Sequence, residues 1–491
     1  MSSETFISPA ARNQTEVFAV SGVDPEVLAY AMAKYSRSAL SMRESLTEIS
    51  SQRAEQFLNT FYFQYGHRSI ADLAHIAFAI ERLSLLAAIV LVDEQRWDGQ
   101  ERSTRYQNFL KSGWYFPDFG TDAASAQLYS ETITSLFAAY QQTTPAVLEA
   151  LRRRVPCPDG MKPEAYERTL KARAFDVARY LLPLATNTSL GQIVNARTLE
   201  CQVSRLLSHP AAEVRDLGIK LREASTAPTL VKYAQPSNYE IQTRAELTQA
   251  AGELLKSLSI GLPHAVVDLV EPTETLEVEL ASTLIYSASH HPYRQIRDLV
   301  AQLPEARISE IIELGLRNRG KHDEALRAFH AGAALRFDIL MDIGGFRDMH
   351  RHRRCTQIIQ PFTALHGYET PTSGDLGPDV NILEESGILT SFQSALDQAH
   401  AASARINASQ ASEAAQSALY LLPLATRIRS LFKMDFAEAQ YIIELRSGPA
   451  GHFSYRRVAW QMFLALQRQH PALAAHIRVT DFTKPIDLLQ R

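Results

Sequence analysis

The heptapeptide Tyr-Leu-Leu-Pro-Leu-Ala-Thr decides the fold because it occurs twice, at residues 180–186 and again at residues 420–426. The two copies lie close to half of the 491-residue chain apart, and seven mixed residues do not repeat by chance over such a length. Each copy follows a long alanine-rich pattern of helical periodicity, at residues 126–154 and at residues 391–419. The sequence therefore predicts two homologous halves.

Aromatic and proline residues precede each of these helical patterns, at 114–117 and at 367–371, which supports the same division. Proline- and glycine-containing punctuation between residues 235 and 275 marks the junction. We place the first domain at 1–240 and the second at 241–491.

Residues 75–81 and 335–340 have the mixed alternation of strands, whereas most other segments have helical spacing. The expected fold class is α+β, with helices in the majority.

The composition, with 46% hydrophobic and 21% charged residues, excludes a disordered or fibrous protein. Fifty basic against 54 acidic residues give a formal charge of -4, which excludes attraction of nucleic acid or anionic membranes by bulk charge. Three cysteines are too few for a disulfide framework or a thiolate zinc site. The polar N-terminus lacks a signal-peptide core, and the longest apolar run, 85–92, is far shorter than the ~20 residues of a membrane span. We therefore predict a cytoplasmic protein.

Residues 349–354, Met-His-Arg-His-Arg-Arg, form a dense basic cluster that has several interpretations. It could be a solvated helix end. Alternatively, Arg351, His352 and Arg353 could point in different directions around a helix and grip a polyanion. Zinc could bind to His350 and His352, but the neighbouring arginines disfavour a divalent cation, and we predict no metal. Nucleic-acid binding has little support, because no second basic stripe with interleaved aromatics accompanies the cluster.

Four further polar segments have no specific meaning singly. They lie at 65–69 (Tyr-Gly-His-Arg-Ser), 100–106 (Gln-Glu-Arg-Ser-Thr-Arg-Tyr), 195–197 (Asn-Ala-Arg) and 444–446 (Glu-Leu-Arg). A surface salt-bridge turn or a structural histidine would explain any one of them.

Taken together and in this order, with Val-Ala-Arg at 177–179, these motifs resemble the flavin-dependent thymidylate synthases, the ThyX family. The resemblance spans nearly the whole chain, once in each half. It implies a mixed sheet flanked by long helices and a tetramer whose active sites lie between subunits. It also implies that dUMP is methylated with FAD as cofactor and with methylenetetrahydrofolate and NADPH as co-substrates. A small-molecule nucleotide is thus the expected partner.

Neither half carries the complete family signature. Where the family has Arg-His-Arg, the first half has Asp93-Glu94-Gln95, and the second half has Pro361 and Thr363 at the positions of the motif serine and arginine. The surviving motif residues of the two halves are complementary. We therefore predict a pseudo-dimer with one composite site, and a homodimer of the chain as the equivalent of the family tetramer.

The resemblance assigns the phosphate of dUMP to Arg105, Arg179 and Arg351, where charge-assisted bonds are strong. Ser103 would touch the pyrimidine. Arg446 would stabilise the uracil ring as N3 loses its proton, so that C5 becomes richer in electrons and no cysteine nucleophile is required.

The same resemblance assigns residues to the flavin and to catalysis. The expected flavin contacts are Ser69, Glu101, Asn195, Arg197, Arg351, His352 and Arg353. The expected catalytic residues are Arg446, Ser103 and His67, and the expected substrate contacts are Glu101, Ser103, Arg105, Arg179, Arg351 and Arg446.

Three positions depart from the family pattern: Asp348 replaces a glutamine near the nucleotide, Cys201 replaces a flavin-contacting asparagine, and the second half has Gly320-Lys321-His322 at its Gly-His position. A carboxylate beside a phosphate is unfavourable unless it is paired. Two alternatives to dUMP methylation therefore stay open. One is flavin- and folate-dependent methylation of another uridine-type acceptor, and the other is a non-catalytic nucleotide-binding scaffold.

Overall fold

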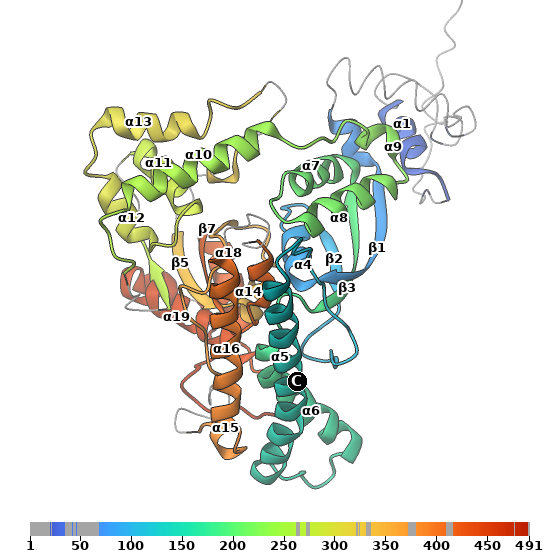
Figure 1. Cartoon of the computed structure of the whole chain (residues 1–491), viewed down its shortest axis with the longest axis vertical. Helices are drawn as coiled ribbons and strands as arrows, with labels where there is room; N and C mark the ends of the chain where they lie inside the picture. Colours follow the sequence, from blue (N-terminus) through green and yellow to red (C-terminus); the bar gives the residue numbers. More distant parts are fainter. Residues whose placement is uncertain are drawn as a thin grey trace, which may run out of the picture. The chain divides into compact units, whose positions relative to one another are not determined.

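The structure is a computed structural model, and it divides the chain into two compact units (Figure 1). The small unit comprises Met1–Ile76, Asn195–Glu200 and Ala224–Tyr233, and the large unit comprises Ala77–Val194, Cys201–Glu223 and Ala234–Arg491. The residues described are 20, 22–34, 42, 46, 68–261, 266–271, 275–320, 323, 325–329, 335–371, 380–408, 416–475 and 477–489.

In the small unit, α1 (Pro25–Lys34) packs against the 3-10 helix η3 (Arg68–Leu73). Glu26 Oε1 accepts hydrogen bonds from the backbone N–H groups of Thr229 at 2.7 Å and Leu230 at 3.1 Å. These groups begin the short helix α9 (Pro228–Val231) and have no partner within that helix, so the glutamate stabilises its first turn.

Two sheets contain the described strands. The first has the order β1-β3-β2, with β1 at His75–Ser84, β2 at Asp98–Glu101 and β3 at Asn187–Asn195. The second is antiparallel in the order β4-β5-β7-β6, formed by Val267–Leu269, Leu335–Asp342, Arg427–Met434 and Thr356–Ile359. The strands predicted at 75–81 and 335–340 are confirmed.

The strands β1 and β5 each lead into a short helix whose first turn is capped by a side chain. Ser84 Oγ accepts from Ala87 N at the start of α4 (Leu85–Leu91), and Asp342 Oδ1 accepts from Gly345 N at the start of α14 (Ile343–Met349). Each cap side chain also forms a hydrogen bond with a residue that is distant in the sequence, one as a donor and the other as an acceptor. Ser84 Oγ donates to Glu213 at 2.6 Å, whereas Asp342 accepts from the hydroxyl of Ser454.

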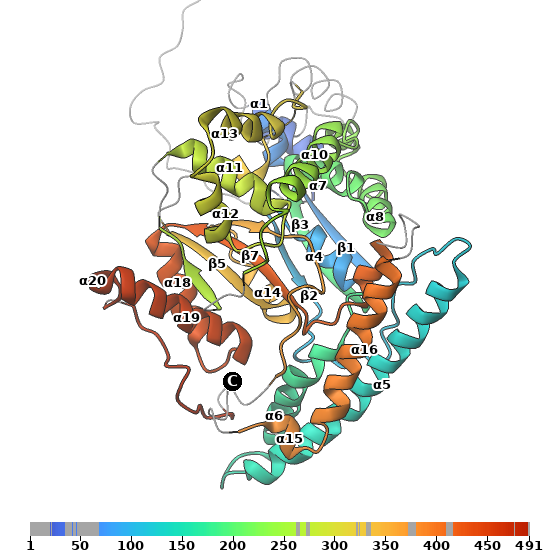
Figure 2. The same cartoon turned by 60° about the vertical axis from the view of Figure 1, so that its left-hand side comes forward.

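The long helices of the two halves lie side by side, α5 (Ala123–Arg154) against α16 (Leu389–Asn407), as Figures 1 and 2 show. The helix predicted at 126–154 is confirmed. The helix predicted at 391–419 is confirmed as far as Asn407 and again at residues 416–418; residues 409–415 lie outside the described part of the chain, and Leu419 begins a 3-10 turn. The structural reason is the repeated heptapeptide, whose tyrosine lies in this turn before the chain enters β7.

The two heptapeptide copies pair with each other antiparallel about Pro183 and Pro423, within the large unit. Their backbone hydrogen bonds are reciprocal: Leu184 N to Leu422 O and Leu424 N to Leu182 O, both 2.9 Å, with Ala185 N to Tyr420 O at 2.8 Å and Ala425 N to Tyr180 O at 3.2 Å. Such self-complementary contacts are those of a two-fold interface. The two ThyX-like halves therefore pack as a pseudo-dimer.

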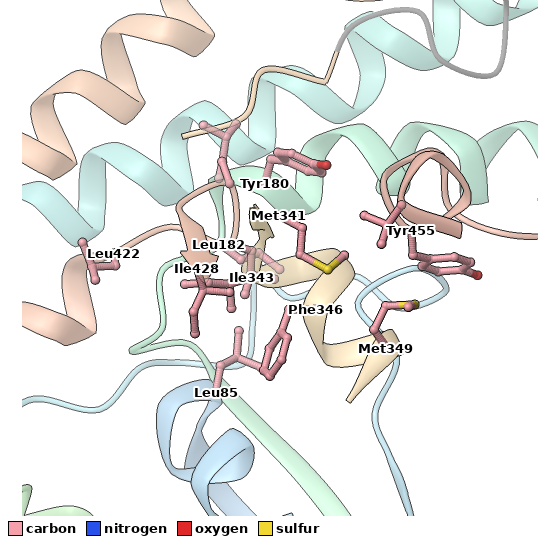
Figure 3. Packing of buried hydrophobic residues seen from close by; sticks show 14 of the residues in the cluster. Leu85, Tyr180, Leu182, Met341, Ile343, Phe346, Met349, Leu422, Ile428 and Tyr455 are labelled. Atoms are coloured by element: carbon pink, nitrogen blue, oxygen red, sulfur yellow. The ribbon is translucent and has the colours of Figure 1, made fainter. Parts of the chain in front are cut away.

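Buried side chains from both halves fill the space around this pairing. Figure 3 shows Tyr180 and Leu182 of the first half close to Met341, Ile343 and Ile428 of the second. One continuous hydrophobic cluster thus joins the halves, and its burial is the main source of their association.

A second hydrophobic cluster lies under the helices α10 to α13 and includes Leu431 and Ile358 of the second sheet. The strand β7 therefore has one face toward these helices. The remaining helices of the large unit and their bounds are α6 (Pro163–Ala178), α7 (Ala196–Leu207), which begins in the small unit, α8 (Ala212–Glu223), α10 (Asn238–Leu254), α11 (Leu276–Ser287), α12 (Tyr293–Val300), α13 (Glu305–Leu314), α15 (Ile382–Glu385), α18 (Phe436–Ser447), α19 (Phe453–Gln469) and α20 (Pro471–Ala474), with 3-10 turns at Arg179–Leu181, Arg327–Phe329 and Leu419–Leu421.

Across the described ranges, no helix combines the length and the apolar character that crossing a bilayer would need.

Glu279 of α11 anchors a buried charge network beneath these helices. Its carboxylate bonds the ammonium of Lys433, which has no solvent exposure, and accepts from Arg336 Nε at 3.0 Å and from the Tyr293 hydroxyl at 2.9 Å. Buried charges of this kind are tolerated only when they are paired.

We expect Glu279→Gln to lower the free energy of unfolding by about 2 kcal/mol, because Lys433 and Arg336 would lose their common carboxylate. Urea unfolding measures the change. The matched control is Glu277→Gln, since Glu277 is exposed on the same helix. An unchanged unfolding midpoint for Glu279→Gln would contradict the role of this network.

Candidate functional site

Arg105 lies in the turn after β2, and a carboxylate fixes it. Its Nε and Nη2 donate to the two oxygens of Asp176 on α6, at 2.7 and 3.2 Å. Its Nη1 donates to the Tyr455 hydroxyl at 2.9 Å, and Nη2 also reaches the Ala450 carbonyl at 3.3 Å. Burial disfavours the charge, but Asp176 outweighs burial and raises the pKa of Arg105. A first-half arginine is thus held by groups of both halves.

Arg179, in the 3-10 turn after α6, is a buried cation with open donors. Its side chain is 2% exposed, and Nη1 approaches Asp348 Oδ2 at 3.5 Å. In the described part of the chain, its Nε and Nη2 have no hydrogen-bond partner. A Cβ at Gly344 would lie 3.5 Å from both of these nitrogens, so the guanidinium lies against the backbone of α14. Unsatisfied buried donors require a partner, and this edge of the guanidinium suits an oxyanion.

Arg446, near the end of α18, is oriented by a histidine. Its Nε donates to His352 Nε2 at 2.8 Å, so the imidazole accepts and is neutral. The guanidinium also lies over the Tyr455 ring, 5.3 Å from its centroid, while that of Arg105 lies 5.7 Å from the same ring. Tyr455 therefore joins an arginine of each half.

Burial and the Arg446 charge lower the pKa of His352 from 6.5 to about 3. Because the folded state has the lower pKa, the unfolded state binds more protons between these values. The stability that the neutral His352 contributes is therefore fully present above pH 6.5 and is lost as the pH falls toward about 3.

We expect His352→Gln to flatten this part of the stability–pH curve. Thermal unfolding at a series of pH values measures it. The comparison variant is His470→Gln, which changes an exposed histidine. If His352→Gln and the wild type have the same slope between pH 6.5 and about 3, the neutral state of His352 is wrong.

Further contacts join the halves beside this cluster. Glu101, at the end of β2, forms an ion pair with Arg347 of α14. Arg353 Nη1 donates to the carbonyls of Val92 at 2.6 Å and Glu94 at 2.8 Å, and its guanidinium lies 4.7 Å from the Trp97 ring. Burial lowers the pKa of Arg353 to about 10, so it stays charged near neutrality.

The basic hexamer differs from its predicted form. The helix α14 ends at Met349, and residues 350–354 form a turn. The prediction that Arg351, His352 and Arg353 radiate around a helix is therefore wrong. The hexamer does lie at a helix end, with Arg351 and Arg354 exposed, but its two histidines are buried. His352 N bonds back to Met349 O at 3.1 Å, which closes the turn and buries His352, whereas Arg351 stays exposed. Since Nε2 of His352 accepts from Arg446, that nitrogen has no lone pair for a metal.

In the first half, the segment that stands in place of Arg-His-Arg forms ion pairs with arginines. Asp93 pairs with Arg327, and Glu94 accepts from Arg205 Nε at 2.9 Å and Nη2 at 2.7 Å. The Asp93 pair joins the two halves, whereas the Glu94 pair lies within the first half.

The structure thus brings Arg105, Arg179, Arg446 and His352 into one cluster through Tyr455, Asp176 and Asp348. Ser103 lies beside it, and its Oγ accepts from Arg105 N at 3.2 Å.

Other predicted residues belong to the small unit and are described within it. Asn195 Oδ1 accepts from Thr198 N at 2.8 Å in the first turn of α7, and Arg197 Nη1 donates to Asp72 at 3.4 Å. Ser69 lies in η3, and its side chain is not described. His67 lies outside the described residues.

Sequence reasoning missed Asp176, Tyr455 and Arg347. Asp176 gave a signal, because it is a carboxylate among apolar residues just before the predicted Arg179. Tyr455 gave none, since a tyrosine on an amphipathic helix is ordinary core.

Known proteins resemble this chain over both of its halves. The sequence profile of the family described as thymidylate synthase complementing protein matches residues 19–229 and 271–472. A UPF0159 protein of Chlamydia muridarum is 28% identical over 504 residues, covering 95% of this chain and 92% of the relative. A UPF0159 protein of Thermoplasma acidophilum is 24% identical over 92% of this chain and 94% of the relative. The flavin-dependent thymidylate synthase of Clostridium tetani is 26% identical over 44% of this chain and 84% of the relative.

Solved structures of similar proteins align with about half of the chain. ThyX of Helicobacter pylori, in complex with FAD and dUMP, is 17% identical, with a TM-score of 0.29, over 43% of this chain and 96% of that chain. The UMP/dUMP methylase PolB of Streptomyces cacaoi, bound with 5-Br dUMP, is 19% identical, with a TM-score of 0.28, over 43% and 89%. Since the family profile matches two segments that together span most of the sequence, this chain belongs to the family of thymidylate synthase complementing proteins, the ThyX flavin-dependent thymidylate synthases.

Proposed function

We propose that the chain methylates dUMP to dTMP reductively at one composite site, with FAD as cofactor and methylenetetrahydrofolate and NADPH as co-substrates. The observation that carries the proposal is the meeting of Arg105 and Arg179 from the first half with Arg446 and Asp348 from the second. Complementary motif residues, scattered over the sequence, share one cluster.

Arg179 is the proposed main ligand of the dUMP phosphate, through its open Nε and Nη2. Four of the five N–H groups of Arg105 already have acceptors, so Arg105 offers the phosphate its remaining Nη1 donor. Arg351, which is exposed, would complete the phosphate contacts, and Ser103 would touch the pyrimidine.

Arg446 is the proposed catalytic cation. The neutral His352 accepts from its Nε and fixes its orientation without competing for the substrate charge. A positioned guanidinium beside the uracil favours loss of the N3 proton, because it stabilises the negative charge that develops on the ring. Electron density at C5 then rises, which prepares this carbon for alkylation.

The guanidinium of Arg351 is exposed, and its donors suit the anionic part of FAD. When bound, FAD supplies the redox chemistry of the methylation. His352 and Arg353 of the same turn are further proposed contacts, with Glu101 and His67. On the small unit, Ser69, Asn195 and Arg197 are the proposed flavin residues.

Asp348 supports a second candidate, methylation of another uridine-type acceptor. It lies 3.5 Å from Arg179 Nη1 and therefore offsets part of the positive charge there. An acceptor with a less charged phosphate would bind more easily than dUMP.

The proposal includes the organisation of the chain. The two domains are 1–240 and 241–491, and the assembly is a homodimer that corresponds to a ThyX tetramer. The second composite site, where Asp93 and Glu94 pair with arginines, is inactive.

The visible absorption spectrum of the purified full chain with FAD tests the function, before and after addition of dUMP. We expect a bound flavin band that dUMP perturbs. A flavin band that responds to UMP or another uridine phosphate, but not to dUMP, would favour the second candidate. The absence of flavin binding would overturn the proposal in favour of a non-catalytic scaffold.

A further inference from the structure

Arg429 is a second buried cation with open donors, on the central strand β7. It is 2% exposed, and its Nη1 donates to Asp338 Oδ2 at 2.9 Å on β5. The same carboxylate already accepts from the Tyr286 hydroxyl at 3.0 Å and from Tyr293 N at 2.7 Å. Nε and Nη2 of Arg429 have no hydrogen-bond partner within the described ranges. A desolvated donor pair of this kind is costly unless something accepts from it.

The open edge of Arg429 has the form that binds two oxygens elsewhere in this protein. Nε and Nη2 of Arg105 hold the carboxylate of Asp176, and the same pair of Arg294 holds that of Asp268. These side-on contacts are the strong, charge-assisted geometry for carboxylates and phosphates. Arg429 presents the same edge without an internal acid.

Two histidines lie near Arg429, since Arg427 N, two residues earlier on β7, donates at 2.9 Å to the carbonyl of Gly367, the residue after His366. The rings of His366 and His290 meet edge to face, with centroids 5.9 Å apart. Nε2 of His366 and Nδ1 of His290 are buried and have no partner among the described residues, although both side chains are half-buried as a whole. Burial, Arg429 and His290 lower the pKa of His366 to about 4, so the ring is neutral near pH 7 and carries one N–H donor.

Gln360, which directly follows the strand β6, holds this cluster together. Gln360 N donates to Arg429 O at 3.1 Å, and its Nε2 donates to His291 O at 3.0 Å. The loop with His290 is therefore tied to the strand with Arg429, so the cluster is preformed.

Among the described residues of the first half, the position that corresponds to Arg429 carries no cation. In the second sheet, Gln360 N donates to Arg429 O, and Arg429 directly precedes the paired residue Ser430. In the first sheet, Arg102 N donates in the same way to Ser189 O, and Ser189 directly precedes the paired residue Leu190. Ser189 thus stands where the second half has a guanidinium. The cluster does not belong to the residues that the two halves share.

We propose that Arg429, His290 and His366 form a second oxyanion site that takes a phosphate group. A divalent cation is excluded by the guanidinium. A tetrahedral oxyanion has enough oxygens for the guanidinium edge and for two imidazole N–H groups, whereas a carboxylate has two. The phosphate is either inorganic or part of a nucleotide, since the donors are the same for both.

The test is a titration of the full chain with inorganic phosphate, in phosphate-free buffer, followed by the ring signals of the histidines in NMR. The Arg179→Met variant serves as background, because it removes the other proposed phosphate ligand. We expect the signals of His366 and His290, assigned from His366→Gln and His290→Gln, to move with phosphate. Binding should weaken about tenfold in His366→Gln.

Arg429→Lys keeps a charge beside Asp338 but removes the two-donor edge, and it should abolish the phosphate response while the unfolding temperature stays close to that of the wild type. The matched control is His400→Gln, because His400 is a partly buried histidine bonded to Thr426 at 2.9 Å. It should retain phosphate binding.

A response to dUMP without one to inorganic phosphate would identify a nucleotide as the source. Signals of His366 and His290 that respond to neither, or a phosphate response that persists in Arg429→Lys, would overturn the site, whether or not the chain methylates dUMP.

Discussion

Arg446→Ala is expected to lower the rate of dTMP formation about 10³-fold, with dUMP affinity reduced far less. The reason is that a fixed cation aimed at developing charge acts mainly in the transition state, and removing one such donor costs 10²–10³-fold or slightly more. Single-turnover formation of dTMP measures the rate, and equilibrium titration of dUMP measures the affinity.

Two further variants make this result specific to Arg446. Arg478→Ala removes an exposed arginine whose partner, Glu444, lies on the same helix as Arg446. This variant should leave the rate unchanged. His352→Gln should lower the rate by a smaller factor, because the amide also offers an acceptor to Arg446. If Arg446→Ala turns over at the wild-type rate, the second half does not supply the catalytic cation.

Arg179→Met is expected to weaken dUMP binding at least about 100-fold and yet to leave the protein as stable as before, or more stable by about 1 kcal/mol. Binding is lost because Nε and Nη2 are the open donors of the site. Stability is kept because replacing a desolvated, half-satisfied cation by an apolar side chain of similar size relieves an unfavourable burial. Calorimetric titration and thermal unfolding of one preparation measure both effects.

The opposite signs separate a binding role from a folding role. A variant that loses both affinity and stability would mean that Arg179 is a structural residue. The matched control is Arg152→Met, since Arg152 is exposed and bonds Glu167 through the same pair of nitrogens. It should change neither quantity.

The sequence predicted the parts of this site that depend on local pattern. The repeated heptapeptide predicted two halves, and the helical and strand periodicities located α5, β1 and β5, because burial of one face imposes these periods. The turn at 350–354 was predicted wrongly as a helix. The two-turn helix α14 ends where His352 turns inward to Arg446, a contact between residues 94 positions apart that no local pattern encodes.

The site residues that the sequence did not predict were missed for the same reason. Asp176 and Tyr455 contact Arg105 across separations of 71 and 350 residues, so only the folded chain reveals them. Half-buried ion pairs such as Glu94 with Arg205 give no signal in the sequence either, since each residue alone suggests a surface charge.

The reciprocal pairing of the two heptapeptides has a consequence for how this protein responds to dilution. In an assembly of separate subunits, a site at the interface disappears when the concentration falls below the dissociation constant, because each encounter costs translational and rotational freedom. Here the partners of the pairing are residues of one chain, so their effective concentration is set by the connecting polypeptide and not by the solution. The arginine cluster should therefore persist at any dilution at which the chain stays folded, even where a homodimer has separated into single chains.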